Sequence, residues 1–594
     1  MVFAGFKGLL TGKLTPRAAM LETLRRAKIR ARHKAERASL NTRAETAARL
    51  QPHLQAQSPI ELLNHFRQRT TPFFFRGFES TKETALLQQQ LFPDETAQLL
   101  SGARTCVDRH RWSLLGFGEF DFREAIEWRR DPLSEKLWPL EYHADIQLIR
   151  RDGSDVRVLW ELNRLGHLVH LGRAFAISGE RRFSEEIFAQ LESWHAQNPL
   201  GLGPNWSSAM EVALRATNLL AAFTSCRKSE SLTVERLLLF LKVLDQHGEH
   251  IERNLEFSYL GNSNHYLSDL VGLLWIGLTL PELANSDRWK SFALKELSSE
   301  ISKQVLPDGA DHEGSTGYHR YVLELFLYSF TLCRENGIEL PEIYHERLWL
   351  MLDYLASYLR PDGSAPLIGD TDGGRLLQIA ERAADDHSYL LPIGAALFGA
   401  ADFKPRGQTV SEEMLWLLGE QGIRQYERLM PSSQEAQSRA FPEAGTYVLR
   451  SGDAYLLFNL SNAKSSGRSS HRHNDALSVE VAACGRSFIL DPGTYVYTAN
   501  LEERHRFRST AFHSTVQLDG MEQNTTEVEQ PFILGKEARA KIVEWQTDVE
   551  KDLVVGEHPG YERLHERVTH QRSVTFDKKA RWWLIEDWLF GRGE

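Results

Sequence analysis

The sequence predicts a multidomain α+β protein in which a long helical region precedes an antiparallel β-sandwich. Apolar residues recur with a helical period from about residue 15 to residue 430, and the period changes to two after about residue 436. The chain has 594 residues, more than one hydrophobic core usually serves. We therefore expect an N-terminal helical arm over 1–135, a larger helical domain over 136–435 and a β-sandwich over 436–594.

The helical region consists of amphipathic segments separated by short breaks that carry Pro, Gly, Asn or Asp. Helices of this length, joined by short turns, stack as antiparallel pairs and form a solenoid or a closed toroid. The clearest helical segments are Leu159–Ile177, Ala209–Cys226, Thr233–Leu255, Tyr266–Leu280 and Tyr321–Glu335.

The C-terminal region alternates short strands with tight turns. Thr446–Arg450 and Ala454–Leu460 predict one hairpin, and Ala476–Ala482 and Ser487–Asp491 predict another. The chain ends directly after a predicted strand, so we expect this domain to be truncated or unusually short. Further strands are expected at Ser514–Leu518, Leu553–Gly556, Ser573–Phe576 and Arg581–Trp588, and a linker at Gly419–Arg439.

Composition and charge exclude several classes of protein. A formal net charge of -10 argues against a broad basic surface for nucleic acid. The four cysteines form no close pairs, which argues against a disulfide scaffold or a thiolate zinc site. No apolar run approaches the roughly 20 residues that span a bilayer. Met1–Leu14 shows no signal peptide, so we expect a cytoplasmic protein, or a periplasmic or secreted one whose export signal has been removed.

Positive charge is concentrated in two places. The basic stretch Leu24–Arg37 predicts an exposed helix, which is either a solvated face or a surface for a polyanion. The second concentration would suit an anionic ligand. Its members are Arg468, His471, Arg472, His473, Arg504, His505, Arg506, Arg508 and His513.

Two polar loops each open an apolar helix. Gly261–Tyr266 contains two asparagines, a serine and a histidine, which would serve either as a helix cap or as a binding site. Pro307–Arg320 is longer than a cap requires and brings Tyr318 next to a histidine and an arginine. We expect the second loop to be part of an active site on a rigid helical frame.

A third motif, Ser470–Asp475, precedes a strand. His471 and His473 alternate on this segment and would point in opposite directions on a regular strand, so we expect them to have different roles. His473, Asp491 and His513 would supply two imidazoles and one carboxylate, a usual ligand set for a divalent ion. A hydrogen-bonded histidine network without metal is the alternative.

The order of these motifs resembles the heparinase II/III superfamily of polysaccharide lyases. The resemblance runs from about residue 120 to the end and includes the helical-domain stretches Trp160–Arg164 and Asn205–Arg215. It implies an incomplete (α/α) toroid as the catalytic domain, followed by β-sheets, with an anionic polysaccharide bound in the cleft between them. It also implies β-elimination at a uronic acid.

The resemblance also implies residue roles. Tyr318 matches the catalytic tyrosine, Asn264 with His265 matches the position that neutralises the substrate carboxylate, and His471 matches the catalytic histidine. His473, Asp491 and His513 match the ligands of a mainly structural metal, with Zn²⁺ expected first and Mn²⁺ or Ca²⁺ as alternatives. Substrate contacts are expected from Asn205, Trp206, Arg215, His319, Arg320, Glu313, Arg506 and Arg508.

The chemistry of elimination explains this choice of residue types. Removal of the uronate C5 proton places negative charge on the adjacent carboxylate, which Asn264 and His265 would stabilise by hydrogen bonds. Tyr318 and His471 would then supply acid and base. A phenol has an ordinary pKa near 10, so positive groups such as Arg320, His319 or His471 must favour its anion.

Several alternatives remain open from the sequence alone. Glycosaminoglycans (heparan sulfate, hyaluronan or chondroitin) lead as substrates, and alginate is the second candidate. An inverting glycoside hydrolase would need two carboxylates, which Glu313, Asp370 and Asp372 offer. A non-catalytic carbohydrate-binding protein is the remaining class. The sequence also allows a homodimer.

Overall fold

The computed structural model describes residues 16–39, 47–114, 116–405, 407, 409–432, 436–461 and 471–592. The segment Met1–Leu14 and the basic residue Arg468 lie outside these residues. The chain divides into two compact units. The first contains 1–298, 329–338 and 376–379, and the second contains 299–328, 339–375 and 380–594. The boundaries near residues 135 and 435 stay predictions.

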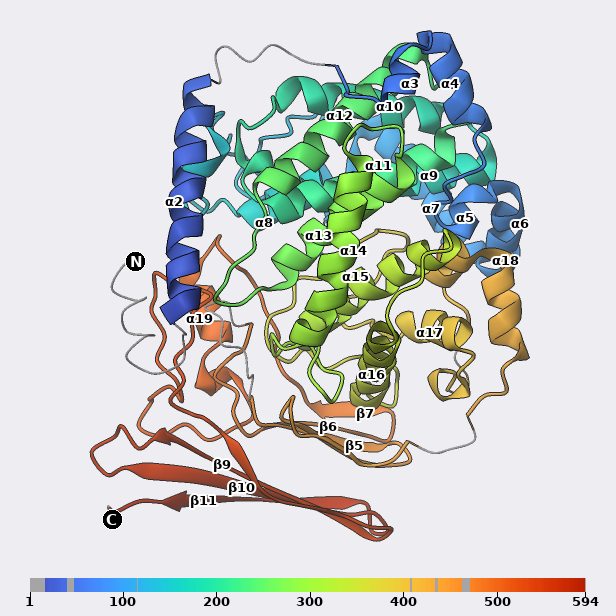
Figure 1. Cartoon of the computed structure of the whole chain (residues 1–594). Coiled ribbons are helices and arrows are strands. Elements are labelled where there is room, and N and C mark those ends of the chain that lie inside the picture. Colours follow the sequence, from blue (N-terminus) through green and yellow to red (C-terminus); the bar gives the residue numbers. More distant parts are fainter. Residues whose placement is uncertain are drawn as a thin grey trace. The chain divides into compact units, whose positions relative to one another are not determined.

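The first unit is built almost entirely of helices, as its amphipathic segments predict (Figure 1). Its short hairpin pairs β1 (Arg111–Ser113) with β2 (Glu119–Asp121). The helices are α2 (Pro16–Ser39), α3 (Pro52–Gln55), α4 (Pro59–Gln68), α5 (Arg76–Glu79), α6 (Thr81–Leu91), α7 (Pro93–Arg109), α8 (Val156–Asn163), α9 (His167–Ser178), α10 (Arg181–Gln197), α11 (Ala209–Cys226), α12 (Val234–Arg253), α13 (Asn264–Thr279) and α14 (Ser286–Gln304), the last of which ends in the second unit.

Helix α11 is the centre of the first unit. It packs against α9, α12 and α13 and is buried on nearly every side, as expected for a helix that is apolar all round. At Gly272 of α13, an added Cβ would lie 2.5 Å from the Cβ of Ala213, so glycine permits this close approach. The predicted single helix Leu159–Ile177 is wrong, because Leu165 adopts a left-handed conformation (φ 59°) and separates α8 from α9.

Within its described residues, the second unit combines helices with two antiparallel sheets. The sheet orders are β3-β4-β5-β6-β7 and β11-β10-β9-β8. The helices are α15 (Thr316–Glu335, which ends in the first unit), α16 (Glu342–Tyr358), α17 (Leu390–Phe398), α18 (Glu412–Arg428) and α19 (Leu501–Phe507). The strands are β3 (Arg439–Phe441), β4 (Thr446–Ser451), β5 (Ala454–Asn459), β6 (Ser478–Ala483), β7 (Arg486–Ile489), β8 (Lys541–Thr547), β9 (Lys551–Tyr561), β10 (Val568–Asp577) and β11 (Trp582–Phe590).

The two sheets pack face to face as the predicted β-sandwich (Figure 1). Their shared core includes Leu456 and Phe458 from one sheet and Val554 and Phe576 from the other. Both predicted hairpins are confirmed, as β4 with β5 and as β6 with β7. Among the described residues, no helix combines the length and apolar character that a membrane span requires.

Two predictions for this unit are wrong. Ser514–Leu518 forms no strand, because side chains of Arg572 and Tyr561 bind the carbonyl groups of Ser514 and Val516 in place of a neighbouring strand. The predicted linker from Gly419 is helical as far as Arg428, the end of α18.

Candidate functional site

Tyr318 lies in the first turn of α15, directly after the polar loop that the sequence singled out. Its backbone N–H donates to the hydroxyl of Ser315 at 3.1 Å, and this hydroxyl donates to the backbone carbonyl of Asp370. At Gly317, an added Cβ would lie 2.4 Å from the hydroxyl oxygen of Thr371. Glycine therefore allows the start of α15 to lie against the loop that carries Asp370.

Asp370 is the polar centre of the second unit, with a side chain that is 0% exposed. Its two carboxylate oxygens accept both terminal N–H groups of Arg504, one of them at 2.7 Å. Nδ1 of His471 and Nε2 of His473 each lie 2.9 Å from a different oxygen, and Thr494 donates at 3.3 Å. Burial alone would raise the pKa of Asp370, but Arg504 and the two histidines hold it well below its usual range.

His471 lies against the ring of Tyr318. The ring centroids are 3.5 Å apart and the planes differ by 11°. On its other nitrogen, Nε2 of His471 lies 3.1 Å from a carboxylate oxygen of Glu313. Burial lowers the pKa of His471, but its contacts with Asp370 and Glu313 outweigh burial and raise it to about 9. The face of the phenol therefore lies against a cationic ring.

The expectation that His471 and His473 point in opposite directions is wrong. Residues 471–475 form no strand, and both imidazoles reach Asp370. Gly369 makes this possible, because it has a φ of +72° and an added Cβ would lie 2.5 Å from the carbonyl oxygen of His471. The backbone N–H of Asp370 donates to that same carbonyl at 2.7 Å.

Of the three positive groups expected beside Tyr318, the structure places His471 against its ring. Arg320 donates instead to Glu324 at 3.0 Å and to the carbonyl of Gly374 at 2.6 Å. Burial lowers the pKa of His319 to about 3, so this imidazole is neutral. Arg504 is a second cation near the phenol: burial lowers its pKa, but Asp370, and more weakly Tyr318, raise it above the usual value.

His473, Asp491 and His513 form a buried cluster whose possible ligand atoms all lie within 4.8 Å of one another. Nε2 of His473 contacts Asp370, and Nδ1 of His513 lies 3.1 Å from Asp491. The opposite nitrogens, Nδ1 of His473 and Nε2 of His513, are buried and have no hydrogen-bond partner among the described residues. Two orphaned imidazole nitrogens beside a carboxylate fit a divalent ion, and Asp370, on the opposite side of the His473 ring, sets the orientation of that ring.

In the first unit, α13 begins with Asn264 and His265. Ser263 caps this helix and accepts the backbone N–H of His265 at 3.4 Å. The N-terminus of a 16-residue helix favours an anion, because its first N–H groups point outward along the helix dipole. Asn264 is 0% exposed, whereas the side chain of His265 is 41% exposed and lies 2.6 Å through Nδ1 from Glu256.

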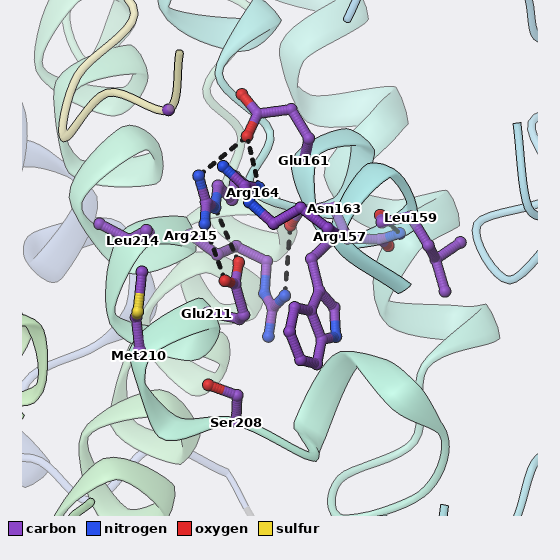
Figure 2. A network of polar contacts seen from close by, with 12 residues as sticks. Arg157, Leu159, Glu161, Asn163, Arg164, Ser208, Met210, Glu211, Leu214 and Arg215 are labelled. Atoms are coloured by element: carbon purple, nitrogen blue, oxygen red, sulfur yellow. Dashed lines mark hydrogen bonds and ion pairs between the residues drawn. The ribbon is translucent and has the colours of Figure 1, made fainter. Parts of the chain in front are cut away.

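Asn205, Trp206 and Arg215, which were expected to bind substrate, are buried inside the first unit. Arg215 donates to the backbone carbonyl group of Asn163 at 3.2 Å (Figure 2) and to that of Asn205 at 2.8 Å. Burial lowers the pKa of Arg215 to about 9. Their placement favours a structural role in holding α11 against its neighbours.

The same stretch reaches the α13 site through other residues. The hydroxyl of Ser208 donates to Glu256 at 2.7 Å, and the backbone N–H of Met210 donates to it at 3.2 Å. The next residue, Glu211, accepts two hydrogen bonds from Arg164 (Figure 2). Sequence reasoning missed Glu256, although an acidic residue just before the Asn-His motif was an available signal.

The remaining residues that were expected to contact substrate differ in their exposure to solvent. Arg506 is exposed and pairs with Glu503 at 2.9 Å. Arg508 is 0% exposed and donates to the carbonyl groups of Pro531 and Ile533, which favours a structural role. Glu313 is 1% exposed and contacts His471.

Comparisons with known proteins show similarity in sequence and in fold. The profile described as "Heparinase II/III N-terminus" matches residues 45–384, and "Heparinase II/III-like, C-terminal" matches 433–594. The heparin-sulfate lyase of Pedobacter heparinus is 26% identical over 492 residues, which cover 80% of this chain and 64% of the relative. That of Bacteroides stercoris is 23% identical over 497 residues, which cover 79% and 64%. The chain thus spans just under two thirds of the length of these relatives.

A crystal structure of heparinase III superposes with a TM-score of 0.66 at 18% identity, covering 90% of this chain and 75% of the other. This likeness confirms the predicted fold class, an incomplete (α/α) toroid followed by an antiparallel β-sandwich. Because the two profiles together match most of the sequence, the chain belongs to the heparinase II/III family.

Proposed function

We propose that this chain is a polysaccharide lyase that cleaves a uronate-containing glycosaminoglycan by β-elimination. The observation that carries the proposal is the stack of Tyr318 on His471, with His471 set between Asp370 and Glu313. It joins a phenol and an imidazole, the two proton-transfer groups that elimination needs. The relatives named heparin-sulfate lyases support heparan sulfate as the first polymer to test.

Stabilisation of the enolate is the larger part of the chemistry. When the C5 proton leaves, negative charge develops on the uronate carboxylate. Asn264 and His265 stand at a helix N-terminus and carry donors for this charge, and one preorganised donor of this kind is worth on the order of 3 kcal/mol. We assign them the binding of the carboxylate.

Tyr318 and His471 carry the proton transfers in this proposal. One group removes the C5 proton and the other protonates the glycosidic oxygen as it leaves, and the configuration at C5 decides which group does which. The positive charges of Arg504 and His471 favour the phenolate form of Tyr318.

Two of the three carboxylates that a hydrolase would draw on, Asp370 and Glu313, do not favour that alternative. Asp370 is 0% exposed and is bound to Arg504, and Glu313 is 1% exposed beside His471. An inverting hydrolase needs two carboxyl groups that reach the scissile bond and a water molecule.

We also propose that His473, Asp491 and His513 hold a divalent metal, with zinc as the first candidate and manganese or calcium as alternatives. When bound, the ion would cross-link the loops before β6 and after α19 and would set the position of the segment that carries His471. The support is the pair of buried imidazole nitrogens without hydrogen-bond partners among the described residues.

The experiment is a polymer panel. The protein is incubated with heparan sulfate, hyaluronan, chondroitin and alginate, and the unsaturated uronate product is followed by ultraviolet absorbance. A signal from a glycosaminoglycan supports the proposal, and a signal from alginate alone would reassign the substrate. New reducing ends without the absorbance would mean hydrolysis and would overturn the reaction type.

A further inference from the structure

Glu256 lies in the segment that joins α12 to α13, and it is fixed by several groups at once. Its carboxylate pairs with Nδ1 of His265 at 2.6 Å and accepts the hydroxyl of Ser208 at 2.7 Å. It also accepts the backbone N–H of Met210 at 3.2 Å, and its own backbone N–H donates to Asp269 at 2.6 Å. The start of α11 and the first turns of α13 therefore both hold Glu256 in place.

The local electrostatics make Glu256 the charged member of two neighbouring carboxyl groups. Burial raises its pKa, but His265, Ser208 and Met210 outweigh burial and bring it down to about 2. Burial and the charge of Glu256 raise the pKa of Asp269 well above its usual range. The protonated form of Asp269 is therefore favoured when Glu256 is ionised.

Among the described residues, Glu211 is a further carboxylate that interacts electrostatically with His265. The pKa of Glu211 is raised by burial but lowered more by Arg164, Arg157 and, to a smaller degree, His265. Glu211 is already neutralised by Arg164, with two hydrogen bonds of 2.7 and 2.8 Å (Figure 2). Among the described partners of Glu256, by contrast, His265 is the one that carries positive charge.

This pairing determines which hydrogens the imidazole of His265 carries. A carboxylate accepts only, so Nδ1 of His265 must donate to Glu256. With Nδ1–H fixed, Nε2 carries a hydrogen only in the charged ring, and the same attraction that ionises Glu256 favours that charged ring. A neutral His265 would present a lone pair at Nε2, which would repel a carboxylate ligand.

We propose that Glu256 is a positioning residue: it fixes Nδ1–H of His265 and keeps the ring cationic, so that Nε2–H is a donor for the uronate carboxylate. The inference rests on the proposed function, which assigns carboxylate binding to Asn264 and His265. It extends the site to a residue that contacts no substrate itself.

The test uses two substitutions of Glu256. Glu256→Gln keeps the shape but removes the charge, and its single carbonyl oxygen can replace only one of the two carboxylate oxygens, either the one bound by Ser208 and Met210 or the one bound by His265. Glu256→Met removes both the charge and the hydrogen bonds. Glu186→Gln is the matched control, because Glu186 pairs with His110 at 3.1 Å elsewhere in the same unit.

The first readout needs no substrate. The ring nitrogens of His265 are followed by NMR in protein with nitrogen-labelled histidine, and the signal is assigned by its loss in His265→Gln. We expect Glu256→Gln to lower the titration midpoint of His265 by about one pH unit or more, and Glu186→Gln to leave it unchanged. An unchanged midpoint in Glu256→Gln would overturn the pairing, whether or not the chain is a lyase.

The second readout is the pH profile of kcat/KM on the polymer that the panel selects. Glu256→Gln is expected to lower kcat about ten- to a hundredfold, to change KM less, and to move the basic limb of the profile to lower pH. Ser208→Ala removes one anchor of the same loop and should leave the profile in place. If Glu256→Gln and Ser208→Ala lose the same activity with the same profile, Glu256 only anchors the loop and the proposal is wrong.

The outcomes separate this inference from the proposed function. If the wild type cleaves no polymer while the midpoint of His265 shifts as expected, the lyase assignment fails and the Glu256–His265 pair stands. If the midpoint shifts but kcat/KM is unchanged in an active enzyme, the positioning role is wrong. Should Glu256→Met fail to fold, the nearly isosteric Glu256→Gln still decides both readouts.

Discussion

The imidazole of His471 lies parallel to the phenol of Tyr318, with ring centroids 3.5 Å apart and an angle of 11° between the planes. His471 is held from both ring nitrogens, by Asp370 and by Glu313, so its ring has little freedom to turn. Tyr318 lies in the first turn of the long helix α15, and Ser315 caps this turn. The two rings are thus fixed from opposite sides by groups far apart in the sequence.

The first prediction concerns the hydroxyl of Tyr318. Tyr318→Phe keeps the ring stack but removes the hydroxyl to which we assign a proton transfer, so kcat is expected to fall by at least about a hundredfold. The midpoint of thermal unfolding should stay within a few degrees of the wild type. The matched control is Tyr447→Phe, a tyrosine of the β-sandwich core, which should retain turnover. Retained activity in Tyr318→Phe would refute the assigned role.

The second prediction concerns the buried ion pair of Asp370 and Arg504. Asp370→Asn leaves the guanidinium of Arg504 charged and 0% exposed, so the free energy of unfolding is expected to fall by about 3–5 kcal/mol in urea titrations. Glu503→Gln breaks the exposed pair with Arg506 and should cost less than about 1 kcal/mol. If Asp370→Asn and Glu503→Gln lowered the free energy of unfolding by similar amounts, Asp370 would not be the electrostatic centre of the unit.

The third prediction concerns the metal. His513→Ala should abolish one equivalent of bound divalent ion, measured by elemental analysis of the purified protein. A chelator should lower the unfolding temperature of the wild type, because an ion present at 100 times its Kd stabilises the fold by about 2.7 kcal/mol. His312→Ala is the control, since it removes a member of the other cluster of metal-binding residue types, Asp311, His312 and Glu313. If His312→Ala lost the bound metal while His513→Ala retained it, the assignment would be wrong.

The fourth prediction is the acid sensitivity of the β-sandwich. His558 accepts the backbone N–H of Gly560 at 3.1 Å and lies 3.1 Å from His570, which in turn lies 2.7 Å from Asp587. Burial, reinforced by the charges of His570 and Arg572, lowers the pKa of His558 from 6.5 to about 3. Between these two pH values the unfolded chain binds a proton that the folded protein does not, so stability falls as the pH falls.

His558→Gln should therefore reduce the pH dependence of the free energy of unfolding by up to about 1.4 kcal/mol per pH unit between pH 6.5 and about 3. The measurement is a series of urea titrations across that range. His565, whose side chain is 97% exposed, supplies the control. His565→Gln should show the same slope of unfolding free energy against pH as the wild type. An identical slope in His558→Gln would show that His558 is not the acid-sensitive group.

Local patterns account for the parts of the fold that were predicted. The helix Ala209–Cys226 coincides with α11 because its apolar residues cover every face, and the hairpin at Ser451 follows from alternation around a tight turn. Leu165 illustrates the limit: a left-handed residue inside an apolar run leaves no periodic signal, so α8 and α9 were merged.

Motifs in the sequence indicated the candidate residues Tyr318 and His471 and the possible ligand set His473, Asp491 and His513, and the structure brings the members of each group together. The supporting contacts of the site were not predictable, since Asp370 meets His471 and Arg504 across 101 and 134 positions of sequence. The basic stretch around Arg504 suggested an anionic ligand. In the structure, however, Arg504 and Arg508 bind buried groups of the protein itself. Only the tertiary structure decides which of several charges is buried.

The central claim is that the bond breaks by elimination, and product analysis in water labelled with heavy oxygen tests it most directly. Heparan sulfate, or whichever polymer the panel selects, is digested in this water, and both new chain ends are examined by mass spectrometry. We expect no labelled oxygen at either end and one unsaturated uronate for each bond broken. Heavy oxygen at the new reducing end, with a saturated sugar on the other side, would mean hydrolysis and would contradict the account.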